Sequence, residues 1–411
     1  ARPLSLAASL GESAPARGAA AGGPVAPSAG DAEFLRRVWL DLAGSLPGAG
    51  DARSFLSDKD PARREKLIDR LLSAPEFPRR MGQALTVMLL ERRGGTRIPD
   101  PQWSEFLCKA FAANEPWDRI VRSMIAADGR VEETRPAMKF LADGAGGEQH
   151  RMTHDVGRLL LGRNLLCAQC HDHPSIGDYR QAEYMGLYAY LNQSKVQDDP
   201  KTKKPILVET AAAGKVEFAS VFSPAKKHQT GPRLPGGAEV EVPKYEKGKE
   251  YEVPPGKEAP GVPKFRPREL LAETLIRHPL FARNSVNRFW FLFMGRGLIH
   301  PLDLDHKGNP PSHPALLEAL TREFTDSRFD VRKLVRKILL SNAYQRSSVV
   351  PGKAPAESYR AALAKPLSAE QMAWAVMQAT GALEHVLKAP AGGASKFTTK
   401  DYLSGKSSEP P

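Results

Sequence analysis

The sequence predicts a mainly α-helical protein with two helical domains and a small β-containing insert, rich in Lys and Pro, between them. Apolar residues recur at helical spacing through residues 31–195 and again through 263–383. Residues 196–262 are rich in Lys and Pro instead, with short β-like pieces such as PILVET and KVEFASVF that predict one or two hairpins. No run of about 18 apolar residues occurs, so no transmembrane segment is expected.

The two ends of the chain differ from the rest in composition. Residues 1–30 are dominated by Ala, Gly, Pro and Ser, and residues 384–411 return to Ala, Gly, Ser and Lys. Such segments bury too little apolar surface to form a core, so a flexible N-terminal segment and a loose tail are expected. A start without Met fits a chain whose leader has been removed, and we therefore expect a periplasmic or secreted protein.

Helix signals support the N-terminal domain, residues 31–195. In DPARREKLIDRLLSAPEF, Asp60 suits the N-cap position and Pro61 the first turn. Pro116 separates two amphipathic pieces farther along, and Cys108 falls on the apolar side of the first, as a buried small hydrophobe would. The string HDVGRLLLGRNLLCAQCH is predicted to continue as a helix into its two cysteines.

The C-terminal domain carries similar signals. NSVNRFWFLFMG is apolar on most faces and predicts a buried helix. Ser312 is the expected N-cap of the helix in PPSHPALLEALTREF, with Pro314 in its first turn. Ser368 and Gln371 form a capping box at the start of the last helix, and Gly381 is its expected end.

The segment Cys167-Ala168-Gln169-Cys170-His171 has the attachment pattern of a c-type haem. On a helix, residues three apart share a face, so Cys167 and Cys170 can both reach the vinyl groups of one porphyrin. His171 can then supply the proximal ligand of the haem iron. The motif therefore predicts one covalently attached haem c.

Three other interpretations of this segment stay open. Cys167, Cys170, His171 and His173 are all suitable zinc ligands, although the adjacency of Cys170 and His171 makes a tetrahedral cage within one segment awkward. A redox dithiol also uses Cys-x-x-Cys, but the βαβ context of such enzymes is absent from the predicted elements. The pair can also be a coincidence with no cofactor.

The distal side of the iron is not specified by any motif. Its candidate ligands are His154, Met185, His306 and His313. His313 is favoured slightly, because it stands at a helix start between Pro311 and Pro314, and an open sixth position is equally compatible with the sequence. Asp172 can accept a hydrogen bond from an imidazole, and His173 suits a haem propionate contact or a surface position.

The charge balance points to acidic partners. The formal net charge is +12 with a pI near 9.5. We expect an acidic redox protein or a larger protein complex as the partner. No nucleic-acid-binding signature accompanies the basic residues, so no nucleic-acid partner is expected. Hydrolase motifs such as G-x-S-x-G and H-E-x-x-H are also absent from the sequence.

Two long strings resemble a known domain pair. RRVWLDLAGSLPGAGDARSFLSDKDPARREKLIDRLLSAPEF and CAQCHDHPS resemble the planctomycete-type cytochrome-like domain of unknown function. HPLFARNSVNRFWFLFMGRGLIHPLDLDHKGNPPSHPALLEALTREF resembles the domain that usually follows it. The resemblance covers about residues 31–381, and it implies an exported, mainly helical protein with the haem motif on Cys167, Cys170 and His171.

The sequence thus predicts an extracytoplasmic mono-haem protein that transfers electrons. Two alternatives belong to other classes. One is a structural or assembly subunit of a larger envelope complex, with haem or zinc as a staple. The other is a haem enzyme that acts on a peroxide or a carbohydrate.

Overall fold

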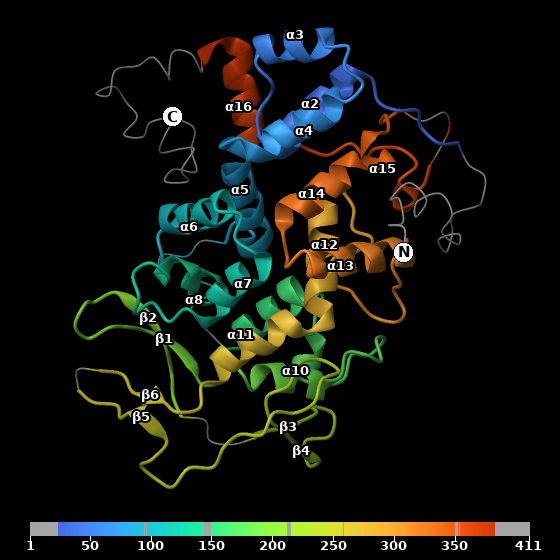
Figure 1. Ribbon diagram of the computed structural model, residues 1–411. Coiled ribbons are helices and arrows are strands. Elements are labelled where there is room, and N and C mark those ends of the chain that lie inside the picture. The colour runs from blue at the N-terminus through green and yellow to red at the C-terminus, as the bar shows by residue number, and fades with distance from the viewer. Residues whose placement is uncertain are drawn as a thin grey trace.

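The computed structural model describes residues 24–382, apart from 94, 96, 144–148, 212–214, 258, 350–351 and 353. In these residues the chain is mainly α-helical, as predicted: it contains the α-helices α2 to α16, and the strands form only three two-stranded sheets. Figure 1 shows α5 to α8 on one side of the molecule and α12 to α15 on the other. The six strands lie at the end opposite α3 and α16 (Figure 1).

The N-terminal half consists of nine α-helices: α2 (Asp31–Leu42), α3 (Ala49–Ser57), α4 (Arg63–Ser73), α5 (Glu76–Leu90), α6 (Asp100–Ala112), α7 (Trp117–Ala126), α8 (Lys139–Ala142), α9 (Gln149–Asp155) and α10 (Gln181–Tyr188). The carboxylate of Asp60 accepts a hydrogen bond from the Ala62 N–H at 2.7 Å, in the turn that leads into α4. α4 itself starts at Arg63, slightly later than the sequence signals placed it.

The C-terminal half contributes six α-helices: α11 (Pro267–Arg277), α12 (Pro279–Met294), α13 (Pro314–Asp326), α14 (Val331–Leu340), α15 (Asn342–Gln345) and α16 (Ala369–Thr380). The predicted capping box of α16 is present, and Gly381 ends the helix with a positive φ of 73°. The N-cap of α13 is His313, one residue after the predicted Ser312.

The segment between the two halves forms three antiparallel hairpins. They pair β1 (Ser194–Asp198) with β2 (Pro205–Glu209), β3 (Val216–Ala219) with β4 (Lys227–Thr230), and β5 (Tyr251–Val253) with β6 (Val262–Pro263).

The first hairpin is anchored to the helices by a buried arginine. The Arg268 guanidinium donates to the carbonyl oxygens of Ile125 and Ala127 at 2.7 and 2.8 Å. The Glu209 carboxylate, at the end of β2, accepts a hydrogen bond from the backbone N–H of Arg268 at 2.9 Å. Buried charges are stable only when paired and hydrogen-bonded, so these contacts fix the hairpin to α7 and α11.

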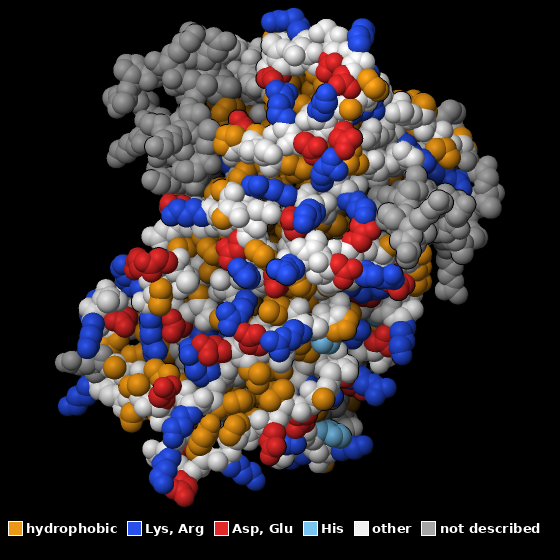
Figure 2. All heavy atoms as spheres, in the orientation of Figure 1, with side chains coloured by type: hydrophobic (Ala, Val, Ile, Leu, Met, Phe, Trp, Pro, Cys, Tyr) orange, Lys and Arg blue, Asp and Glu red, His pale blue; other side chains and the backbone are white. Residues whose placement is uncertain are grey.

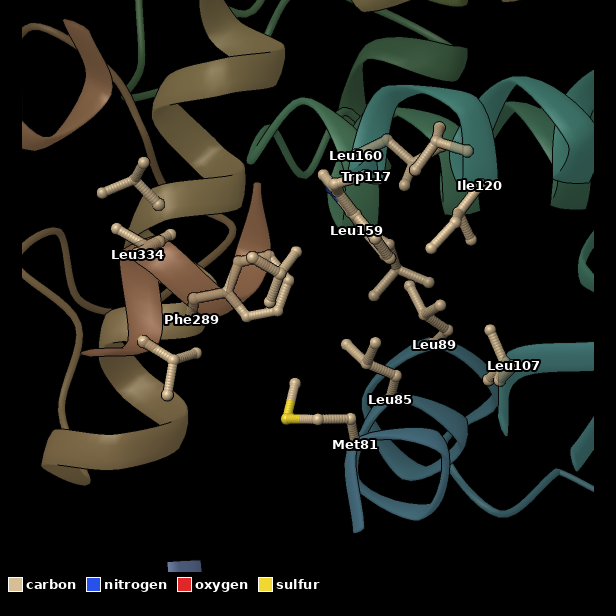
Figure 3. Close-up of a cluster of buried hydrophobic side chains, with 14 of the residues drawn as sticks. Met81, Leu85, Leu89, Leu107, Trp117, Ile120, Leu159, Leu160, Phe289 and Leu334 are labelled. Atoms are coloured by element: carbon tan, nitrogen blue, oxygen red, sulfur yellow. The ribbon is translucent and has the colours of Figure 1, made fainter. Parts of the chain in front are cut away.

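Both halves of the chain contribute to one hydrophobic core. A large cluster of buried side chains runs from Ala29, before α2, to Tyr359, between α15 and α16. At its centre the rings of Trp117 and Phe289 lie 5.4 Å apart, edge to face, and the Trp117 indole N–H donates to the Ser285 hydroxyl at 2.9 Å. Figure 3 shows side chains of α5, α7, α12 and α14 pointing toward one another in this cluster. The two helical segments therefore pack as one body.

At the other end of the molecule, α16 packs beside α2. The Gln371 side chain donates to the Leu40 carbonyl oxygen at 2.7 Å, and the side-chain amide oxygen of Gln378 accepts from the Leu46 N–H at 3.1 Å. None of the described helices is long and apolar enough to cross a membrane.

Candidate functional site

The Cys-x-x-Cys-His motif lies in a short turn and not on an α-helix. α9 passes into a single π-helical turn, η3 (Val156–Leu160), and the helix ends there. Gly162 follows with a φ of +71°, and a Cβ atom at this position would lie 2.8 Å from the Asn284 side-chain oxygen. The prediction of a helix that continues into the motif is therefore wrong, because the chain turns at a glycine and then pairs Arg163 with Leu304.

The motif itself is a 3-10 turn, η4 (Cys167–Gln169), packed against α10. The Cys167 carbonyl oxygen accepts hydrogen bonds from the N–H groups of Cys170 and His171, at 3.3 and 3.4 Å. Ala168 is fully buried between the cysteines, whereas Cys167 and Cys170 are both free and exposed. The turn thus buries one side against the protein and leaves both thiols accessible.

The backbone carbonyl group of Asp172 selects the tautomer of the His171 imidazole. Its Nδ1 atom lies 2.7 Å from the carbonyl oxygen of Asp172. A carbonyl oxygen only accepts hydrogen bonds, so Nδ1 carries the hydrogen and donates it. The lone pair is then on Nε2, which is the state in which a histidine binds a metal through Nε2.

Two nearby histidines are in the opposite state. The Nδ1 atom of His173 accepts from the Ser175 N–H at 3.1 Å, and that of His306 accepts from the Gly308 N–H at 3.1 Å. A neutral imidazole that accepts at Nδ1 carries its hydrogen on Nε2. Both rings flank Tyr179, with centroid distances of 6.0 and 5.7 Å. These contacts support roles in loop packing for His173 and His306.

Asp172 holds the motif to the start of α10. Its carboxylate accepts a hydrogen bond from the Gln181 N–H at 2.8 Å, at the helix N-terminus. The Gln181 side chain in turn donates to the carbonyl oxygens of Gln169 and Ala219, at 3.3 and 3.1 Å. The imidazole of His171 therefore meets the backbone oxygen of Asp172, while the carboxylate positions the helix.

His154 lies beside the motif. Its ring is 5.4 Å from that of Tyr184, edge to face, and its Nε2 atom is buried with no hydrogen-bond partner among the described residues. Burial lowers the pKa of His154, against an opposing interaction with the Gln169 side chain. Met185, on α10, packs against the small buried cluster that contains Ala168.

His313 has its contacts elsewhere. It is buried at the start of α13, with its Nδ1 atom 3.1 Å from the Ser312 hydroxyl and its ring 5.6 Å from that of Tyr359. Burial also lowers the pKa of His313. All of these neighbours belong to the C-terminal half, so the geometry gives His313 no connection to the motif.

Three exposed apolar side chains adjoin the motif, and they were not predicted from the sequence. Leu166 precedes Cys167 and is 57% exposed; Val221 and Phe222, between β3 and β4, are 59% and 78% exposed. The Phe222 ring lies 5.0 Å from that of His171. The only sequence signal was an apolar pair, VF, in an otherwise Lys- and Pro-rich segment.

The third cysteine has no part in this site. Cys108 is buried on α6, as predicted, and its Sγ atom lies 3.7 Å from the Pro78 carbonyl oxygen. Burial raises the pKa of the Cys108 thiol to about 12, so it is not a nucleophile at neutral pH.

A zinc cage is not preformed in the part of the chain that the structure describes. No three His, Cys, Asp or Glu side chains gather there as ligands of one metal ion would. Structural zinc takes four tetrahedral ligands, and the side chains of the described residues are not arranged in this way.

The fold and the exposed motif together define a mainly helical protein with a candidate cofactor-attachment turn. Residues 15–196 match PSCyt2, described as a protein of unknown function (DUF1549). Residues 267–407 match PSD1, described as a protein of unknown function (DUF1553). In this order the two matches form the planctomycete-type domain pair that the sequence resembles. Comparisons with curated proteins and with solved structures found no significant match.

Proposed function

We propose that this chain is an extracytoplasmic c-type haem protein that transfers electrons. Cys167 and Cys170 would form the thioether bonds and His171 would bind the iron. The observation that carries the proposal is the contact between His171 Nδ1 and the Asp172 carbonyl oxygen, which leaves the Nε2 lone pair available in the residue that follows two exposed, unpaired cysteines of the same turn.

The residues at the motif fit the requirements of haem attachment. Thioether formation requires thiols that a porphyrin can reach, and both are exposed and unpaired. An iron ligand requires a histidine with a fixed ring and a free nitrogen lone pair, and the Asp172 carbonyl provides both conditions for His171. When bound, a haem supplies a one-electron iron couple whose potential depends on its axial ligands and its exposure to water.

The remaining side chains of the site have positioning roles. Asp172 and Gln181 hold η4 against α10, so the peptide that carries His171 keeps its orientation. Among the candidates for the sixth ligand, His154 has the strongest support, because it lies at the motif with a buried, unpartnered Nε2 atom. Met185 packs nearby, and His313 does not contact this region through any of its described neighbours.

Charge supports an acidic redox protein as the partner. The net charge of +12 would attract one over a distance of roughly a Debye length, about 8 Å at physiological ionic strength. Figure 2 shows Lys and Arg side chains interspersed with Asp and Glu over the visible face. The attraction would therefore come from the overall excess of positive charge more than from one basic patch on this face.

An alkaline pyridine haemochrome spectrum tests this function. The full chain should be produced in a host that attaches haem c, beside a Cys167→Ala, Cys170→Ala variant. We expect a c-type band from the native chain and none from the variant. No band in either protein, with one equivalent of zinc by metal analysis, would overturn the proposal in favour of a structural protein. A high-spin spectrum that responds to peroxide would instead indicate a haem enzyme.

A further inference from the structure

Three exposed apolar residues, Leu166, Val221 and Phe222, adjoin the motif, and we call these three residues the patch. Each residue of the motif that would contact the haem has one exposed apolar neighbour: Leu166 is bonded to Cys167, the Val221 N–H donates to the Cys170 carbonyl oxygen at 3.0 Å, and Phe222 packs on the His171 ring. Phe222 is the most exposed large hydrophobic side chain in the described part of the chain.

The position of the patch is fixed relative to the thiols. Val221 and Phe222 lie in the turn that joins β3 to β4, about fifty residues after the motif. The Val221–Cys170 backbone bond holds one side of this turn, and the bond from Gln181 to the Ala219 carbonyl oxygen holds the end of β3. The Phe222 N–H donates to the Ser220 hydroxyl at 3.3 Å. These hydrogen bonds hold the β3–β4 hairpin against the motif.

Exposed apolar side chains usually mark a surface that something covers. Burying a Phe side chain stabilises a fold or a complex, so leaving one in water at a fixed position loses that stabilisation. Isolated exposed hydrophobic residues are common, but here three of them are direct neighbours of one cofactor motif. A porphyrin has a broad apolar face, and one attached to Cys167 and Cys170 would lie beside these side chains.

We propose that Val221 and Phe222 form an apolar wall of the haem site and that the β3–β4 hairpin covers the cofactor. This inference rests on the proposed haem attachment. It assigns a binding role to an insert that lies outside both matched families, which cover residues 15–196 and 267–407. The occupant is the porphyrin and not a protein partner, because each of the three residues adjoins a different residue of the motif: Leu166 and Val221 through the backbone, and Phe222 through its ring on His171.

Trypsin cleavage of the hairpin tests the inference independently of electron transfer. Lys226 and Lys227 follow the patch and are exposed, so they report on the mobility of this turn. We compare the full chain carrying haem with the Cys167→Ala, Cys170→Ala variant. Cleavage at these lysines should be about tenfold slower with haem, the factor that corresponds to about 1.4 kcal/mol of added local stability.

Three further variants distinguish contact between Phe222 and the haem from the effect of shortening any exposed apolar side chain. Phe222→Ala should remove most of the protection and shift the reduction potential to more negative values, because water at the haem favours the more highly charged ferric state. Phe222→Leu should retain most of the protection from trypsin and a reduction potential close to that of the native chain. Val349→Ala, which shortens a side chain that is 74% exposed, is the matched control and should change neither.

The haemochrome band is measured first on every sample, so the two proposals fail in different ways. A native chain without covalent haem overturns both. Stoichiometric haem with equal cleavage rates in loaded and haem-free protein, and with an unchanged potential in Phe222→Ala, overturns the hairpin's role alone.

Discussion

The Nδ1 atom of His171 donates a hydrogen bond to the carbonyl oxygen of the next residue, Asp172, at 2.7 Å. This contact needs no side chain from another part of the fold, because the turn after η4 itself brings the two groups together. It selects one tautomer of the imidazole and leaves Nε2 able to bind a metal. The neighbouring His173 has the opposite arrangement, which sets His171 apart within the same short segment.

Replacement of His171 should change the iron's ligation without removing the haem. In His171→Ala the two thioether bonds can still form, so the haemochrome band is retained, but the absorption spectrum of the ferric protein should shift toward high spin. Added imidazole should reverse the shift. His306→Ala is the control, because the Nδ1 of His306 accepts a backbone hydrogen bond. Identical spectra for the native chain and His171→Ala would contradict the assignment.

His154 and Met185 can be distinguished as sixth ligands by spectroscopy. We expect His154→Leu to convert a low-spin ferric spectrum to high spin and to create a site that binds cyanide rapidly, because a strong ligand is lost. Met185→Leu conserves volume on α10 and should leave the spectrum unchanged. The reverse pattern would assign the ligand to Met185, and no change in either variant would indicate an open position.

The shared core predicts that the two helical halves unfold together. Phe289 is buried against Trp117, and Phe289→Ala should lower the free energy of unfolding by about 3–5 kcal/mol. Urea unfolding followed by tryptophan fluorescence and by circular dichroism should give one coincident transition. The exposed control Val349→Ala should change stability by less than about 0.5 kcal/mol. Two separate transitions, with only one moved by Phe289→Ala, would show that the halves are independent.

Stability should fall in mild acid because of buried histidines. Burial lowers the pKa of His313 from its usual 6.5, so below that pH the unfolded chain binds a proton that the folded chain resists. This group has no effect on stability above pH 6.5 and destabilises the fold as pH falls below it, by at most about 1.4 kcal/mol per pH unit. Urea midpoints between pH 7.5 and 5.5 should decline less steeply in His313→Gln. If the urea midpoints of the native chain and His313→Gln fell equally with pH, His313 would not contribute to the loss of stability in acid.

Short-range patterns in the sequence were enough to predict most of the helices. The spacing of Leu67, Ile68, Leu71 and Leu72 and the capping box at Ser368 are short-range signals, and the structure has helices at both places. The mainly α fold follows from many such signals. The shared core was not predictable in this way, because Trp117 and Phe289 are far apart in the sequence.

The site was predictable only where its signals are adjacent in sequence. The motif itself is continuous, but the turn around it depends on Gly162 packed against Asn284, a contact with α12. The choice among distal candidates depends on packing too: His154 lies at the motif through Gln169 and Tyr184, whereas His313, favoured for its neighbouring prolines, packs on Tyr359. Val221 and Phe222 were missed because only the folded chain brings them to Cys170 and His171.

Covalent haem attachment is the central claim, and mass spectrometry of one tryptic peptide tests it most directly. Cleavage after Arg163 and Arg180 releases residues 164–180, which contain both exposed cysteines. From protein made in a host that attaches haem c, we predict this peptide with the added mass of one haem and no reaction of either thiol with iodoacetamide. Cys108 is the internal control, and it should react only after unfolding because it is buried. A peptide of unmodified mass, with Cys167 and Cys170 both alkylated in the folded protein, would contradict the account.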